Sequence, residues 1–198
     1  MKKIVQTIST AFFLFILLGI LLGGIYPLIS FGIAKVITPN KAKGSLIYKG
    51  DRVIGSELIG QNFQDVGYFH SRPSACDYDG IKSAGSNLGP TSNKLHENLE
   101  KNVNAYRKIN GIDTQTLVPA DAVTSSGSGL DPHISIKNAR IQASRVALAQ
   151  NLPLQTVFDL IEQFTEKKTL GIFGRERINV LKLNLAVQQA SKENSKRK

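Results

Sequence analysis

The strongest constraint on this chain is a run of uncharged, mostly apolar residues from Ile4 to Ala34, with Lys2 and Lys3 before it and Lys35 after it. A helix needs about 20 such residues to cross the hydrocarbon core of a bilayer. A cleaved signal peptide has a shorter apolar core, of about 7–15 residues, followed by a small-residue cleavage site that is absent here. We therefore predict that residues 1–37 form a retained membrane anchor helix with a short N-terminal end.

The orientation of this helix is less constrained, because lysines flank both of its ends. The short basic N-terminus before the apolar run favours a cytoplasmic N-terminus and a domain outside the cell. A bend is expected near Gly23, Gly24 and Pro27. Gly19 and Gly23 form a small-x-x-x-small step, which predicts close packing on a partner helix. A lipid-facing helix with incidental glycines is the alternative.

Residues 38–191 are expected to form one mixed α+β domain outside the membrane, followed by a disordered basic tail over residues 192–198. The sequence SLIYKGDRVIGSELIG (Ser45 to Gly60) predicts two strands joined by a tight turn. A further short strand is expected over Val66–Ser71, and residues 74–91 should be loop because they are rich in Ser, Gly, Asn, Asp and Pro.

Three helices and one segment that fits either a helix or a strand are predicted in the rest of the domain. The first begins after Thr91 or Ser92 and ends at Gly111, with apolar residues at helical spacing. The second runs from about Ile136 to Gln150 after a Ser135 cap, and the third begins at Pro153. The stretch from Ile178 to Ala190 fits a strand or a helix, and we favour a helix.

Composition narrows the classes of partner. The net charge is +10, but the lysines beside the anchor and the tail account for much of it. There is no tryptophan and no basic stripe interleaved with aromatic residues, so nucleic-acid binding is not expected. The single cysteine, Cys76, cannot form a disulfide within the chain.

The segment SSGSGLDPHIS (Ser125 to Ser135) carries the residue types of several kinds of site. Ser128, Asp131 and His133 suggest a hydrolase, but the G-x-S-x-G spacing of a nucleophile elbow is missing. Asp121, Asp131 and His133 could hold a weak cation, although no zinc pattern is present. The run Ser126-Gly127-Ser128-Gly129 could bind an anion with backbone N–H groups, but no P-loop is present. The simplest interpretation is a shaped loop that leads into the helix at Ile136.

Four stretches, read in order after the apolar helix, resemble the KdpC family, the C subunit of the bacterial Kdp potassium-transporting P-type ATPase. They are YFHSRPSA, AGSNLGPT, VPADAVTSSGSGLDPHIS and RINVLKLNLA, which begin at Tyr68, Ala84, Val118 and Arg177. Two departures from the family pattern stand out. His70 and Ser71 replace an expected Trp-Gly pair, and Arg177 occupies a position that often holds a small or turn-forming residue.

The resemblance implies an accessory subunit, not an enzyme, in the cytoplasmic (inner) membrane. Its partners would be a potassium-channel-like subunit, a P-type ATPase subunit and membrane lipid. The complex would handle ATP and K⁺, and this chain alone would bind no cofactor and no metal. The family is described as a catalytic chaperone that raises the ATP affinity of the ATPase subunit. A domain outside the cell would be separated from cytoplasmic ATP by about 30 Å of hydrocarbon, so that effect would have to be a coupling between subunits.

The same resemblance supplies candidate contacts with a partner or a nucleotide. They are Gly85, Ser86, Asn87, Ser126, Gly127, Ser128, Gly129, Asp131 and His133. The alternative function is a membrane-anchored extracytoplasmic hydrolase or ligand receptor.

Overall fold

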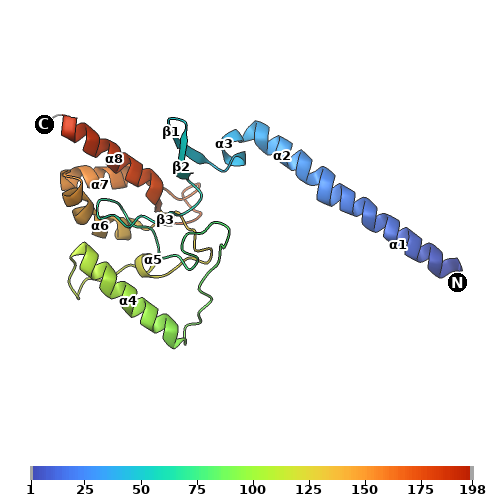
Figure 1. Cartoon of the computed structure of the whole chain (residues 1–198), viewed down its shortest axis with the longest axis horizontal. Coiled ribbons are helices and arrows are strands. Elements are labelled where there is room, and N and C mark those ends of the chain that lie inside the picture. The colour runs from blue at the N-terminus through green and yellow to red at the C-terminus, as the bar shows by residue number, and fades with distance from the viewer. Residues whose placement is uncertain (1, 197–198) are drawn as a thin grey trace. The chain divides into compact units, whose positions relative to one another are not determined.

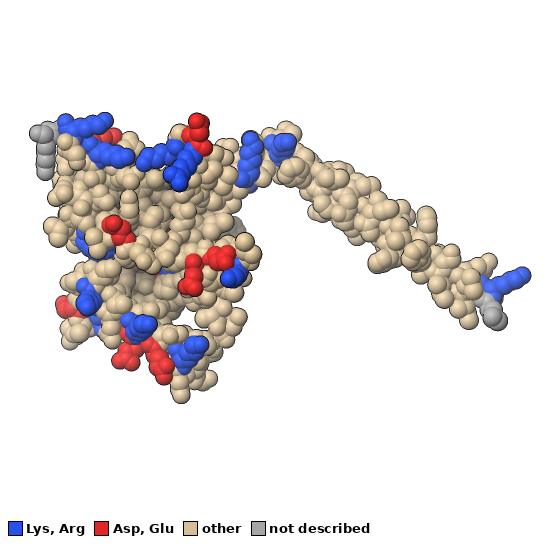
Figure 2. Space-filling view, viewed as in Figure 1, with Lys and Arg blue, Asp and Glu red and all other residues tan. Residues whose placement is uncertain are grey.

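The computed structural model describes residues 2–196 and separates into two compact units, one up to Leu46 and one from Ile47. The first unit holds one continuous helix, composed of α1 (Lys2–Ile20), η1 (Leu21–Ile25) and α2 (Tyr26–Ile37), followed by the short α3 (Pro39–Ala42). The helix is long and apolar enough to cross a membrane, and none of its residues is buried. Charged atoms appear only near its two ends (Figure 2).

The centre of this helix is a single π turn, η1, where the Tyr26 N–H donates to the Leu21 carbonyl. Proline has no N–H, and its ring clashes with the carbonyl four residues before it, which for Pro27 is that of Gly23. Widening the turn by one residue relieves this conflict while the helix continues. The expected irregularity near Gly23, Gly24 and Pro27 is therefore a π turn.

The second unit is an α+β domain, as predicted (Figure 1). It begins with the hairpin of β1 (Leu46–Lys49) and β2 (Arg52–Ser56). A separate antiparallel sheet has the strand order β3-β5-β4, in which β5 pairs with both neighbours. The remaining elements are α4 (Asn93–Asn110), α5 (Ala120–Val123), β3 (His133–Ile134), α6 (Ile136–Ala149), α7 (Leu154–Gln163), β4 (Thr165–Glu166), β5 (Arg177–Asn179) and α8 (Val180–Lys196).

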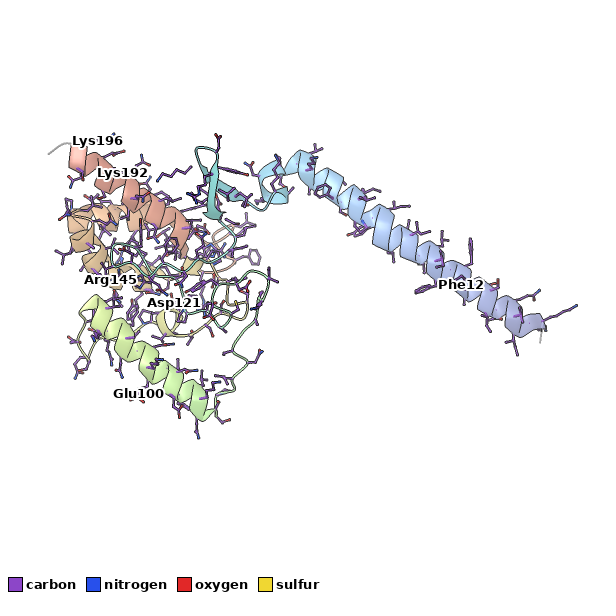
Figure 3. The ribbon with its side chains drawn as sticks, in the orientation of Figure 1. Phe12, Glu100, Asp121, Arg145, Lys192 and Lys196 are labelled. Carbon is purple, nitrogen blue, oxygen red and sulfur yellow. The ribbon has the colours of Figure 1, made fainter. Side chains whose placement is uncertain are left out.

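The hydrophobic core lies where α6, α7 and α8 meet the small sheet. Its fully buried side chains come from all of these elements, and Phe69 joins them from the preceding loop. They include Phe69, Ile134, Val146, Val157, Ile161, Ile178, Leu183 and Val187. Helix α4 packs on α5 and α6, and its outer face carries charged residues such as Glu100 (Figure 3). Burial of this apolar surface is the main force that holds the domain together.

The predicted starts of α4 and α6 and the predicted end of α4 are confirmed together with their physical causes. The Ser92 hydroxyl accepts from the Leu95 N–H at the start of α4, and Gly111 ends that helix in a left-handed conformation (φ 61°). The Ser135 hydroxyl accepts from the Asn138 N–H at the start of α6. Pro153 is the residue before α7, and the ambiguous stretch from Ile178 forms the end of β5 and most of α8.

The strand predicted over Val66–Ser71 is wrong, because two buried amide side chains take the place of a neighbouring strand. Asn184 accepts from the Phe69 N–H at 2.7 Å and donates to the Phe69 carbonyl at 2.9 Å. Gln142 likewise accepts from the His70 N–H and donates to its carbonyl. The backbone of this segment is thus satisfied by side chains from α8 and α6, which periodicity in the sequence cannot reveal.

The disordered tail predicted from residue 192 is also wrong over residues 192–196, which form the last turns of α8 (Figure 3). Residues 197–198 lie outside the described part of the chain. Two side chains hold the end of the helix against the turn before α7. The Ser191 hydroxyl donates to the Gln150 carbonyl, and the Asn194 side chain donates to the Asn151 carbonyl.

Candidate functional site

All but one of the candidate residues lie on two loops that pack directly against each other, here called the loop junction (residues 83–89 and 125–131). The exception, His133, is the first residue of β3. A methyl group added to Gly85 would lie 3.0 Å from the Gly127 carbonyl oxygen. The Ser83 hydroxyl donates to the Ser128 carbonyl at 3.0 Å, across the same contact. The structure therefore brings together two stretches that the sequence had only placed in separate motifs.

Gly129 is buried at the centre of the loop junction and adopts a left-handed φ of 69°. An added Cβ would lie 2.6 Å from the Cys76 sulfur and 2.8 Å from the Ala84 carbonyl oxygen. Both the backbone angle and the space exclude any side chain. The predicted role of glycine in shaping this loop is confirmed at Gly129, whereas Gly127 is exposed and has open space where a Cβ would be added.

Two serines of the segment, Ser126 and Ser128, form hydrogen bonds within it. Ser126 and Ser128 share a hydrogen bond between their hydroxyls at 3.4 Å. The Ser128 hydroxyl also accepts from the Leu130 N–H, and the Gly129 N–H donates to the Ser126 carbonyl. Within the run from Ser126 to Gly129, the Gly129 N–H that an anion would need is therefore already used by the loop itself.

Ser86 and Asn87 lie on the exposed side of the first loop. Asn87 has a left-handed φ of 53°, a conformation that asparagine tolerates better than most residues. Ser86 lines a cavity of about 280 Å³ between the loop junction and α4, with Leu99 and Asn102 on the helix side. The two residues are accessible, unlike Gly129.

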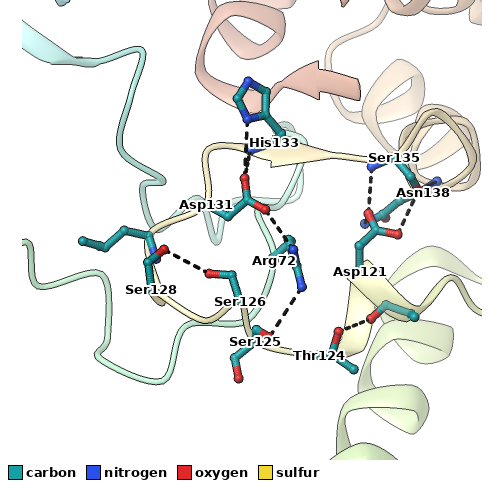
Figure 4. Close-up of polar contacts among 12 residues, drawn as sticks. Arg72, Asp121, Thr124, Ser125, Ser126, Ser128, Asp131, His133, Ser135 and Asn138 are labelled. Carbon is teal, nitrogen blue, oxygen red and sulfur yellow. Dashed lines mark hydrogen bonds and ion pairs between the residues drawn. The ribbon is translucent and has the colours of Figure 1, made fainter. Parts of the chain in front are cut away.

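Asp131 is the centre of an ion cluster (Figure 4). Its carboxylate accepts from Arg72 Nη1 at 2.8 Å and from the His133 N–H at 3.0 Å. Burial by itself would raise the pKa of Asp131, but hydrogen bonds from the side chain and backbone of His133 and from Arg72 outweigh burial and lower the pKa to about 2. Arg72 also donates to the Ser125 carbonyl, so it ties the YFHSRPS stretch to the loop junction.

The His133 ring lies between two carboxylates from different elements. Its Nδ1 is 3.4 Å from Asp131, and its Nε2 is 3.4 Å from Glu166 on β4. Arg177 on β5 donates to the same Glu166 oxygen at 3.0 Å. The departure at Arg177 is therefore a partner of Glu166, and the cluster joins the loop junction to the small sheet.

Asp121 holds the start of α6. Its carboxylate accepts from the N–H and the hydroxyl of Ser135 and from the side chain of Asn138 (Figure 4). Asn138 in turn accepts from the Tyr106 hydroxyl at 2.8 Å, and burial followed by the negative charge of Asp121 raises the pKa of that phenol. Asp121 is a structural cap, not a ligand that points into open space.

A cavity of about 320 Å³ borders this network and is lined by His70, Ser71, Tyr106, Asn138 and Gln142 among others. Burial, and next the charge of Arg145, lower the pKa of His70, which favours the neutral ring. The Ser71 hydroxyl donates to the Gln61 carbonyl. The departures at residues 70 and 71 thus lie in the wall of this cavity.

This geometry does not pair Ser128 with His133 as a nucleophile and its base. The Ser128 hydroxyl bonds within its own loop, while both ring nitrogens of His133 face carboxylates. A nucleophile and its base need a hydrogen bond to each other. Within residues 2–196, no three His, Cys, Asp or Glu side chains gather as a ligand set for a metal ion.

Sequence reasoning missed Glu166, Gln142 and Asn184 as parts of the site and its support. A usable signal exists for two of them. Gln142 and Asn184 are polar residues at buried positions of otherwise apolar helix faces, and such residues normally have specific partners. Glu166 gave no signal, because its contact with His133 depends on sheet pairing.

The packing of Gly19 and Gly23 on a partner helix stays a prediction. A shallow groove on this helix is lined by Gly19 and Gly24, together with Ile16, Ile20 and Leu28. Gly23 is not part of it. The widened π turn shifts the register, so that a residue five positions after Gly19 follows it along the same face.

Comparison with known proteins gives consistent matches over most of the chain. The profile of the family described as K⁺-transporting ATPase, c chain (KdpC), matches residues 8–189. The chain is 48% identical to the potassium-transporting ATPase KdpC subunit of Caldanaerobacter subterraneus, over 89% of this chain and 92% of that protein. It is 47% identical to that of Mycobacterium bovis (86% and 91%) and 49% identical to that of Cereibacter sphaeroides (87% and 91%).

Proposed function

The chain belongs to the KdpC family of potassium-transporting ATPase c chains, and from this we propose that it is an accessory subunit of an ATP-driven potassium uptake pump. Its task is to support assembly of the complex and to raise the affinity of the pump for ATP. The chain itself catalyses no reaction and, taken alone, binds neither ATP nor K⁺.

The observation that carries this proposal is the extent of the family match, which includes both the apolar helix and the domain. The match therefore covers most of the chain and not a single motif. The inward bonding of the loop junction is consistent with a structural role for its serines and glycines. A function based on contacts agrees with both observations.

The proposed partners are a potassium-channel-like subunit and a P-type ATPase subunit in the cytoplasmic membrane. With the N-terminus inside and the domain outside, the domain cannot touch cytoplasmic ATP. Its effect on ATP affinity is then a coupling free energy, typically about 1–3 kcal/mol, or about 5–150-fold in affinity. The candidate contacts on this path are the accessible Ser86, Asn87 and Ser128 and the more buried Asp131 and His133.

The test is reconstitution of the pump with and without this chain. We expect potassium-stimulated ATP hydrolysis to require the chain, and the apparent KM for ATP to fall about 5-fold or more when it is present. A complex that assembles and hydrolyses ATP with the same KM and rate without the chain would reject the accessory role. Hydrolysis of ATP by the purified chain alone would reject its non-catalytic character.

Orientation is tested through the only cysteine. The Sγ of Cys76 donates to the Ser128 carbonyl, and the thiol is partly exposed. Several hydrogen bonds, first of all the one from the Ser74 hydroxyl, lower the pKa of this thiol. The lower pKa favours reaction at neutral pH. A membrane-impermeant maleimide added to intact spheroplasts should label it. Labelling that occurs only after the cells are opened would place the domain in the cytoplasm, where direct contact with ATP is available.

Helix packing is tested by two neighbouring glycines. Leucine at Gly24 would fill the groove that Gly24 shares with Gly19, and we expect it to reduce recovery of the other subunits on purification of the complex. Leucine at Gly23 is the matched control, because Gly23 lies outside that groove. Equal recovery with both variants would mean that the glycines face lipid.

A further inference from the structure

The hairpin between β4 and β5 exposes a cluster of large apolar side chains, here called the apolar tip (Leu170, Ile172 and Phe173). Their side chains are 84%, 77% and 64% exposed. Every residue from Lys167 to Arg177 is exposed, although Ile178, which follows, is fully buried. Contiguous exposed apolar groups on a soluble domain mark contact surfaces more often than isolated ones do.

The backbone of the apolar tip is ordered and strained. Thr169 and Phe173 exchange two hydrogen bonds at 2.9 Å, which closes a tight turn between them. Leu170 and Gly171 are both left-handed, with φ of 54° and 75°. Leucine rarely adopts this conformation, and such strain is found preferentially at functional sites. The turn thus holds an apolar side chain in solvent at a cost to the fold.

The base of the hairpin is fixed to the domain. Thr165 pairs with Ile178 and Glu166 with Arg177 across β4 and β5. Glu166 accepts from Arg177 and faces His133, so the ion cluster around His133 holds the hairpin at its base. The apolar tip therefore lies at the end of a hairpin whose base is held by strand pairing and ion pairs.

Basic residues flank the apolar tip on both sides. Lys167 and Lys168 precede it and Arg175 follows it, and none of the three has an ion-pair partner within residues 2–196. Glu176 is the one acidic residue between Lys167 and Arg177, so the cations exceed it by two. An apolar centre with a basic surround is the composition of elements that lie in the interface of an anionic bilayer.

The base of the hairpin lies next to the end of β2, one of the first two strands of the domain. Next to the hairpin base, Asn179 donates to the Glu57 carbonyl at 2.8 Å, and Lys182 pairs with the Glu57 carboxylate at 2.6 Å. Glu57 directly follows β2, whose partner β1 is the first strand after the apolar helix. The linker to that helix is short, which gives the hairpin a high effective concentration at a membrane surface.

We propose that the apolar tip is a second membrane contact of this chain, in which Leu170, Ile172 and Phe173 enter the interface of a bilayer while Lys167, Lys168 and Arg175 bind anionic headgroups. The occupant is lipid because the cations surround the apolar centre on both sides and the chain carries its own membrane helix. This contact does not depend on the role of the chain in potassium transport.

The natural absence of tryptophan provides a clean test. In the Phe173→Trp variant of the full chain, the new indole is the only one, and the backbone bonds of residue 173 are retained. The protein is reconstituted into vesicles of equal phosphatidylcholine and phosphatidylglycerol, with and without bromine on the acyl chains. We expect a blue-shifted emission that brominated lipid quenches, whichever way the chain inserts.

Leu148→Trp is the matched control, because Leu148 is an equally exposed apolar residue (82%) on α6 of the same tethered domain. Its emission should stay unshifted and unquenched. Equal quenching at both positions would reflect proximity alone and would overturn the proposal. Quenching at neither position would overturn it as well.

The headgroup component is tested by replacing Lys167, Lys168 and Arg175 with Gln in the Phe173→Trp background. Removal of three interfacial charges should weaken insertion about 100-fold on anionic vesicles. The control replaces three exposed lysines of α4, namely Lys94, Lys101 and Lys108. If the introduced indole becomes shielded only after the other pump subunits are added, and then without lipid quenching, the occupant is protein and the proposal fails.

Discussion

The loop junction and the apolar tip both contain left-handed residues, but the first is closely packed and the second is exposed. Each contains left-handed residues, Gly129 in one and Leu170 with Gly171 in the other. In the loop junction the unusual backbone lets two loops approach until no side chain fits between them. In the apolar tip it projects leucine into solvent.

The two regions show that a conspicuous residue pattern need not mark a binding surface. The loop junction is rich in Ser, Gly and Asp because those residues close turns and bond to their own backbone. The hydroxyls of Ser83, Ser126 and Ser128 accordingly form hydrogen bonds inside the domain. The sequence of the apolar tip contains no such motif, yet its apolar side chains and the basic side chains beside it are exposed and available for a partner.

The largest expected effect is at the centre of the loop junction. Alanine at Gly129 would adopt a left-handed backbone and contact Cys76 and Ala84, so we expect the free energy of unfolding to fall by about 2–4 kcal/mol. Urea unfolding of the detergent-solubilised chain, followed by near-ultraviolet circular dichroism, measures it. Alanine at Gly127 should change stability by less than about 0.5 kcal/mol. A loss at Gly129 as small as that at Gly127 would mean that the two loops are not closely packed.

A smaller effect is expected at Asp131 and depends on pH. The pKa of its carboxyl is about 2 in the folded domain against an ordinary 3.8, so its ion pairs stabilise the domain above about pH 4. That contribution is lost as the pH falls from about 4 to about 2. With allowance for partial exposure, Asp131→Asn should cost about 1–2 kcal/mol at pH 7.

The check on this prediction is the pH profile of the difference between the two proteins. The stability of Asp131→Asn should approach that of the unchanged chain as the pH falls below 4. Asp51→Asn, in the exposed turn between β1 and β2, is the control for general charge effects. A constant difference from pH 7 to pH 2.5 would show that the loss at Asp131 comes from packing and not from its charge.

The sequence was sufficient where local chemistry decides the structure. The apolar run, the caps at Ser92 and Ser135 and the terminating Gly111 follow from rules that involve only a few neighbouring residues. The α+β class follows from the same local patterns. The family resemblance rested on four short stretches, whose turns and helix starts are also determined by a few neighbouring residues.

Prediction failed where distant parts of the chain meet. The segment around Phe69 has the residues of a strand, but its backbone partners are the side chains of Asn184 and Gln142, 115 and 72 positions away. The ion cluster required Glu166 to meet His133 through sheet pairing. The tail was expected to be disordered from its charge, although Asn194 and Ser191 fasten it to another turn.

The last predicted change in stability is smaller than those at Gly129 and Asp131, and it should have the opposite sign. Asparagine at Leu170 adopts a left-handed backbone at lower cost than leucine and removes an exposed apolar group, so the free energy of unfolding should rise by about 0.5–1 kcal/mol. In the Phe173→Trp background, the same substitution should weaken lipid quenching of the indole in anionic vesicles. If Leu170 served only folding, the asparagine variant would be less stable and its lipid quenching would be unchanged. A gain in stability combined with a loss of membrane contact would mean that the hairpin keeps a strained leucine for what it touches outside the domain.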